Sequence, residues 1–221
     1  MRPSWKRVTK MSTDTDNAAY LGNIPSMVAF LPGVSSEERT DLQDVLLDAQ
    51  LFAGKQFDFK TQWSSWMHYY RSRLKARGMQ QKGVILGDSL VVSNVDDLLQ
   101  ATFKVSNSAD RERLGGMMQR AFSAMGVNKA AEFYFQNGFD QGRLGSFQVV
   151  PCEKYEPNRT LLLLCSLHLS VDDYAPDTRR LLFHFKGGSY TFDRNIYAAH
   201  RDSVARYLDG KAQSMIRAAS I

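Results

Sequence analysis

Residues 145–193 decide the fold, because three apolar runs lie there between turn-forming residues: SFQVVPCE (146–153), RTLLLLCSLHLSVD (159–172) and RRLLFHFKGGSYTF (179–192). Each run has the length and apolar content of a β-strand. In the middle run the polar side chains Thr160, Ser166, His168 and Ser170 share one parity, and the other parity is wholly apolar: Leu161, Leu163, Cys165, Leu167, Leu169 and Val171. Since alternate residues of a strand point to opposite faces, one face of this strand is predicted to be apolar.

The rest of the chain is mainly helical in pattern. The SSEE sequence at 35–38 is typical of a capping box, and apolar residues follow at helical spacing up to Gly54. Thr61 is suited to cap a second helix, which Gly78 ends, and Asn195 is suited to cap a closing helix. The apolar stripe of that closing helix is Tyr197, Val204, Leu208, Ala212 and Met215. We therefore predict an α+β fold, with N-terminal helices packed on a mainly antiparallel C-terminal sheet and a closing C-terminal helix.

The first 35 residues differ from the remainder. They show no sustained periodicity and are dense in Asn, Asp, Thr, Gly and Pro, so we predict a mobile arm at 1–35 that contributes little to the core. The chain has 221 residues and is 43% hydrophobic, which is enough for a sizeable core. Residues 36–221 are predicted to form a single domain.

Localisation is inferred from what the sequence lacks. No run approaches the roughly 18 apolar residues of a membrane-spanning helix. The start is basic, but residues 11–22 are polar where a signal peptide is apolar, so we expect a cytoplasmic protein without a Sec signal, with membrane association or delivery by another route as alternatives. The two cysteines match neither a disulfide framework nor a metal-ligand spacing, and no motif predicts a catalytic residue, a metal ligand or a tightly bound cofactor.

Positive charge is concentrated at the C-terminus. The formal net charge is +5, and from residue 178 onward there are eight Lys or Arg against three Asp. In the closing helix, Arg194, Arg201 and Arg206 are the predicted contacts to an anionic lipid surface. Nucleic-acid binding through the same helix is the less favoured alternative.

The two cysteines have different surroundings. Cys165 shares the apolar face of its strand, which is typical of a buried thiol, and His168 lies on the opposite face, out of its reach. Cys152 follows Pro151, which lacks a backbone donor, so we expect a strand end or bulge where the thiol faces a pocket. A reactive or modified thiol is therefore predicted at Cys152.

Several stretches together resemble a known family. They are LLDAQLFAGKQFD (46–58), Trp66 to Tyr70 with Gly78 behind, SFQVVPCE, LLFHFK (181–186), and Tyr197-x-x-x-Arg201-x-x-Val204. In this order they are similar to the bacterial proteins related to the Erwinia virulence factor Evf, over about residues 41–208. The resemblance implies an α/β protein without a recognised catalytic site, linked to colonisation of insect hosts, in which a cysteine bears palmitate as a thioester. By position in the first strand of the C-terminal sheet, it implies Cys152 as the acylated residue, with Cys165 second.

A palmitoyl chain changes the energetics of whatever carries it. At about 0.8 kcal/mol per methylene, its transfer from water is worth on the order of 10 kcal/mol, so it is expected inside the domain or in a bilayer. The first hypothesis is a non-enzymatic virulence-type or membrane-interacting protein, S-acylated, whose partners are a fatty acyl chain, membrane lipid and a host-cell membrane. The alternative is a cysteine-dependent enzyme, or a small-molecule or lipid-binding protein, in which Cys152 acts with His184 or His200.

Overall fold

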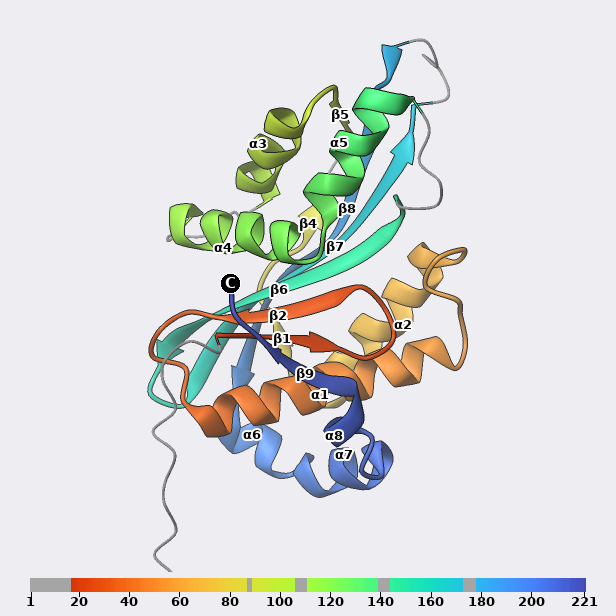
Figure 1. The fold of residues 1–221 in the computed structure, drawn as a ribbon. Helices are drawn as coiled ribbons and strands as arrows, with labels where there is room; N and C mark the ends of the chain where they lie inside the picture. The colour runs from red at the N-terminus through yellow and green to blue at the C-terminus, as the bar shows by residue number, and fades with distance from the viewer. Residues whose placement is uncertain (1–16, 87–88, 106–110, 139–143, 173–177) are drawn as a thin grey trace, which may run out of the picture.

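The computed structural model describes residues 17–86, 89–105, 111–138, 144–172 and 178–221. One twisted sheet runs through the molecule, and helices cover both of its faces (Figure 1). Its nine strands follow the order β3-β8-β7-β6-β2-β1-β9, and β4 and β5 also pair with β8. All pairings are antiparallel except that of β2 with β6. The predicted α+β class is thus confirmed.

The three predicted strands form the centre of the sheet. They are β6 (Ser146–Glu156), β7 (Arg159–Val171) and β8 (Leu181–Asp193). The alternation in β7 divides its side chains between two cores. Leu163, Cys165, Leu167 and Leu169 join one core, and Leu162 and Leu164 join the other. Both faces of β7 are therefore buried, and even the polar Thr160 and Ser166 on the second face are inaccessible to solvent.

The prediction of a mobile arm is wrong for residues 17–35. This segment contains β1 (Ala18–Leu21) and β2 (Ser26–Phe30), and all five residues of β2 are buried. β2 pairs with β1 on one side and, in parallel, with β6 on the other. A strand in that position must be apolar on both faces, so it shows no alternation that would identify it in the sequence. Residues 1–16 lie outside the described residues.

The first helical layer packs against the Leu162 and Leu164 side of the sheet. Its members are α1 (Ser36–Gly54), α2 (Trp63–Ala76), α6 (Arg194–Ala198), α7 (Arg201–Leu208) and α8 (Ala212–Met215). The capping box of α1 is confirmed: the Ser35 hydroxyl accepts from the Glu38 backbone, and the Glu38 carboxylate accepts from the Ser35 backbone. This layer, coloured orange and blue in Figure 1, brings the early helices together with the end of the chain.

The closing helix exists in three pieces. Asp193, not Asn195, caps α6. α7 ends at Leu208, and its C-cap Asp209 has a φ of 48°. Gly210 follows with a φ of 74°, so the backbone leaves the helical region at two consecutive residues. After α8 the chain continues as β9 (Ile216–Ala219), which pairs with β1 at the edge of the sheet.

The second helical layer covers the opposite face. It comprises α3 (Val95–Val105), α4 (Arg111–Ala124) and α5 (Val127–Asn137), which lie against the upper half of the long strands in Figure 1. The short strands β3 (Gln80–Gln81), β4 (Ile85–Leu86) and β5 (Leu90–Val92) all pair along β8. The connection from α2 to α3 thus runs along the sheet edge before the chain crosses to the other face.

Candidate functional site

Both cysteines are packed inside the protein. Cys152 lies in the core beneath α1 and α2, and its thiol is 3.5 Å from the carbonyl oxygen of Val150. Cys165 lies in the core on the opposite face, 4.0 Å from the sulfur of Met118. Both residues are 0% exposed, and burial raises the pKa of each thiol well above its ordinary value. The thiolate is therefore strongly disfavoured at both positions.

The expectation that Cys152 faces a pocket is wrong. Pro151 does not end the strand, because β2 continues beside it and pairs Phe30 with Cys152. The thiol consequently points into a covered part of the sheet face. Neither cysteine lines any of the four described cavities.

Neither predicted histidine partner reaches a thiol. His184 is 2.6 Å from the hydroxyl of Ser89 and 3.3 Å from that of Ser170. Burial, and then the charge of Lys186, lowers the pKa of His184. His200 lies beside Gly78, at the end of α2. Within the described residues, neither sulfur has a histidine or carboxylate at hydrogen-bonding distance.

Two of the three predicted lipid-contacting arginines are engaged in ion pairs. Arg201 binds Asp41 through two hydrogen bonds of 3.0 and 2.7 Å, and Arg194 lies 2.7 Å from Glu37. These pairs fasten α6 and α7 to α1. Arg206 is exposed and has no acidic partner among the residues that the structure describes. Arg194 and Arg201 therefore help to dock the C-terminal helices on α1, and contact of the three arginines with a lipid surface stays a prediction.

Asp44 lies on α1 close to these pairs, without a hydrogen bond or ion pair to any described residue. Burial, and then the charge of Asp41, raises the pKa of Asp44 to about 6. The ordinary value is 3.8, so an ionised Asp44 destabilises the folded state above pH 6, and stability increases as the pH falls toward 4. We predict that Asp44→Asn stabilises the protein by about 1–2 kcal/mol at pH 7.5 in urea denaturation, and that most of the gain is absent at pH 4. The exposed Asp202→Asn is the control, and an equal gain at both pH values would contradict this assignment.

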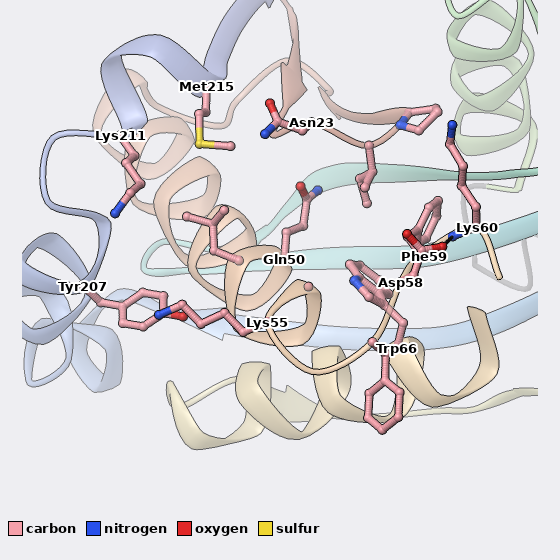
Figure 2. A pocket seen from close by; sticks show the side chains of 15 residues that line it. Asn23, Gln50, Lys55, Asp58, Phe59, Lys60, Trp66, Tyr207, Lys211 and Met215 are labelled. Atoms are coloured by element: carbon pink, nitrogen blue, oxygen red, sulfur yellow. Dashed lines mark hydrogen bonds between the residues drawn. The ribbon is translucent and has the colours of Figure 1, made fainter. Parts of the chain in front are cut away.

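A cavity with a volume of about 420 Å³ lies between α1 and the C-terminal helices. It is formed by segments distant in sequence: the loop between β1 and β2, the second half of α1 with the loop after it, one residue of α2, and the region of α7 and α8. Figure 2 shows side chains from these segments converging on it. The lining residues are Asn23, Ile24, Pro25, Gln50, Leu51, Gly54, Lys55, Phe57, Asp58, Phe59, Lys60, Trp66, Tyr207, Lys211 and Met215.

The cavity has an apolar interior and a charged rim. Trp66 and Phe59 are buried, and their rings meet edge to face with centroids 4.7 Å apart. Partly buried apolar side chains continue the wall outward: Ile24, Leu51, Phe57 and Met215. The lining residues that carry charge are all exposed: Lys55, Asp58, Lys60 and Lys211. A small molecule in this cavity would therefore place apolar surface inside and polar surface outside.

A buried polar chain holds one wall in place. Gln50 on α1 donates from its amide nitrogen to the Ser26 hydroxyl at 2.8 Å, and that hydroxyl donates to the Gln148 carbonyl at 3.1 Å. All three side chains are nearly inaccessible to solvent. Because a buried hydrogen-bonded amide has few alternative positions, this chain fixes α1 against β2 and β6 where the cavity begins.

The sequence analysis did not identify this cavity. Its lining residues follow no single period, and only the aromatic pair Phe57 and Phe59 directly after the end of a helix was a local signal. The other walls come from the β1–β2 loop, which was interpreted as a mobile arm, and from the C-terminal helices.

Among the described residues, no helix is both long and apolar enough to cross a bilayer. In the same part of the chain, no three or more His, Cys, Asp or Glu side chains are grouped to hold a metal ion.

No protein-family model matches the sequence, and no curated protein matches it. The chain is similar to a solved structure named delta-endotoxin, with a TM-score of 0.39 and 11% sequence identity, over 87% of this chain and 89% of that one.

Proposed function

We propose that this protein binds the apolar chain of a lipid or fatty acyl compound in the cavity between α1 and α8, as a binding protein and not as a cysteine-dependent enzyme. The observation that carries the proposal is the cavity itself. Its volume of about 420 Å³ falls in the range of about 300–1,000 Å³ typical of small-molecule sites. Its interior is lined mainly by aromatic and aliphatic side chains, and its charged groups lie at the rim.

The energetics favour a flexible apolar ligand. Each methylene that leaves water for such a cavity contributes about 0.8 kcal/mol. Met215 has an unbranched, flexible side chain that adapts to irregular apolar shapes, whereas Trp66 and Phe59 form a rigid end wall. An alkyl chain with its end against these rings would gain burial along its whole length.

A separate, covalent proposal is a palmitoyl thioester on Cys152, with Cys165 as the second position; it follows from the resemblance to the Evf-related proteins and not from the cavity, which neither cysteine lines. The acyl group would pass from an activated acyl donor to the cysteine sulfur, with departure of the donor's leaving group and loss of the thiol proton. Since both sulfurs are buried and their thiolates disfavoured, attachment would precede closure of the core. Intact mass of protein from its native host, before and after hydroxylamine, distinguishes a thioester from a ligand held without a covalent bond.

Gly54 offers a direct test of the cavity. It lines the cavity, and a Cβ placed on it would have only the Trp66 ring nitrogen within 4 Å, at 3.9 Å. Gly54→Phe therefore fills the cavity without backbone strain. We predict that the neutral fluorescent probe N-phenyl-1-naphthylamine binds the wild type and binds Gly54→Phe at least about tenfold more weakly.

Gly54→Ala is the matched control, because a single methyl group leaves most of the cavity open. It should bind the probe like the wild type, and all three proteins should unfold at similar temperatures. Probe binding that is absent from the wild type, or unchanged in Gly54→Phe, would refute the proposal.

A further inference from the structure

The two ends of the cavity differ in charge. At one end Lys60 lies near Asp58, whose carboxylate also accepts hydrogen bonds from Thr61 and from the Lys60 backbone. At the other end Lys55 lies against Tyr207, and Lys211 lies on the same side of the cavity, as Figure 2 shows; no acidic residue lines the cavity there. The first end is locally neutral and the second is positively charged.

The lysines of the positive end are not paired. Neither Lys55 nor Lys211 forms an ion pair with any residue in the described part of the chain. By contrast, Arg73, Arg77, Arg194 and Arg201 are each bound to a carboxylate of α1. The ammonium group of Lys55 lies 4.5 Å from the ring centroid of Tyr207, so the two side chains already lie against each other. Two unpaired cations at the same end of an apolar cavity favour an anion there.

Tyr207 adds a second and independent observation. Its hydroxyl is buried and finds no hydrogen-bond partner among the described residues. A buried hydroxyl without a partner costs about 1–3 kcal/mol, which an acceptor atom at this position would recover. The hydroxyl is a donor on the residue whose ring the Lys55 ammonium contacts, and Lys211 lines the same cavity, so the missing acceptor matches the anion that the lysines favour.

We propose that this end of the cavity holds the anionic head of a single-chain amphiphile, a fatty carboxylate or an alkyl phosphate, with Lys55 and Lys211 pairing with its charge and the Tyr207 hydroxyl donating to it. The inference rests on the proposed function, since it assigns the head group of the ligand whose chain occupies the apolar interior. The chain runs from Tyr207 toward Trp66 and Phe59. The head joins Lys55, at the end of α1, to the segment of α7 and α8, so the bound ligand also fastens the end of the chain to α1.

Three ligands that share a sixteen-carbon chain but differ in head group distinguish the contribution of the head group to binding from that of the chain. Palmitate, hexadecyl phosphate and 1-hexadecanol compete with N-phenyl-1-naphthylamine at pH 7.5, below the concentrations at which they aggregate. Both anions are expected to displace the probe at concentrations at least about tenfold below that of the alcohol, because hydrogen bonds to a charged group are worth about 1.5–3 kcal/mol. A difference between the two anions identifies which head group the site prefers.

Variants test the assigned residues. Lys55→Met with Lys211→Met should remove the preference for the anions and leave 1-hexadecanol unchanged. Tyr207→Phe deletes only the hydroxyl and should weaken the anions several-fold, again without an effect on the alcohol. Lys75→Met with Lys82→Met removes the same charge from exposed positions outside the cavity, and should keep the preference.

The outcomes distinguish the two proposals. If the alcohol and the anions compete equally in the wild type, the head-group assignment is wrong and the apolar cavity still stands. If the Lys75 and Lys82 variant loses the preference as fully as the Lys55 and Lys211 variant, overall charge and not this site is responsible, and the assignment is again wrong. If neither the probe nor any of the three ligands binds, the proposed function itself fails.

Discussion

Replacing Asp48 with alanine is expected to lower the free energy of unfolding by about 3–5 kcal/mol. Asp48 is 0% exposed and binds two arginines of α2, each through two hydrogen bonds: Arg73 at 2.8 and 3.0 Å, and Arg77 at 3.1 and 3.0 Å. The guanidinium groups are themselves largely buried, with 18% and 11% of their side chains exposed. Without the carboxylate, two adjacent positive charges would remain in a site that water does not reach freely.

The same pairs connect three helices. Arg77 also donates to the Ser203 hydroxyl of α7 at 2.6 Å, and Arg73 lies 4.9 Å from the ring of Tyr207 at the positive end of the cavity. Asp48→Ala should therefore weaken ligand binding as well as stability. Urea denaturation at pH 7.5 measures the loss of stability. Probe binding at a urea concentration where both proteins remain folded measures the loss of ligand binding.

Glu156→Ala is the control for Asp48→Ala. Glu156 pairs with Arg159 at 3.0 Å, but each side chain is 47% exposed. A surface pair of this kind contributes about 0–1 kcal/mol, so the variant should unfold nearly as the wild type does. If Asp48→Ala lost less than about 1 kcal/mol, the arginines would have found other partners or water, and the buried pair would not hold α1 to α2.

The central strands could be predicted because they alternate. In β7 the parity of Leu163 and Cys165 identified a face that the structure buries against α4 and α5. β2 could not be predicted in this way, since Ser26–Phe30 is buried on both faces and is too short to tell from any other apolar run. Its partner is β6, in which Gln148 pairs with Ser26, so the two strands are some 120 positions apart in the sequence. No local sequence pattern indicates a pairing over such a distance.

The candidate site was less predictable than the fold. The sequence analysis placed function at Cys152, because a proline in a strand usually marks an edge or a bulge. Pro151 instead lies within β6, which runs between β2 and β7. The register of β6 with β7 is the same before and after the proline: Val149 pairs with Cys165, and Cys152 pairs with Leu162. The cavity that the structure shows depends on where α8 meets α1, which is a tertiary arrangement with no signature in the order of residues.

Gly187 and Gly188 show how one residue type admits two interpretations. Two adjacent glycines between apolar residues are typical of a hairpin turn. The structure instead shows an uninterrupted β8 through both of them. Glycine inside a strand also allows a neighbouring backbone to approach closely, and this second meaning applies here. A Cβ on Gly188 would lie 2.3 Å from the carbonyl oxygen of Gly83.

Gly187→Ala is accordingly expected to cost about 3–5 kcal/mol. A Cβ on Gly187 would lie within 1.7 Å of the carbonyl oxygen of Leu164 and 2.9 Å of its carbonyl carbon. These are backbone atoms of β7, held by the longest strand pairing in the sheet, so they have no rotamer change with which to withdraw. The two strands must separate locally, and hydrogen bonds on both sides of Cys165 are weakened as a result.

The measurement is chemical denaturation of Gly187→Ala alongside Gly116→Ala. Gly116 lies within α4, and a Cβ there would have only the Arg120 guanidinium within 4 Å, at an ordinary contact distance of 3.6 Å. Because alanine is about 0.5–1 kcal/mol better than glycine inside a helix, the same substitution should stabilise the protein at 116 and destabilise it at 187. Equal effects at the two sites would mean that β7 and β8 are not packed as closely as the structure shows. A large loss confined to Gly187→Ala would establish that a continuous strand, and not a turn, passes through this pair of glycines.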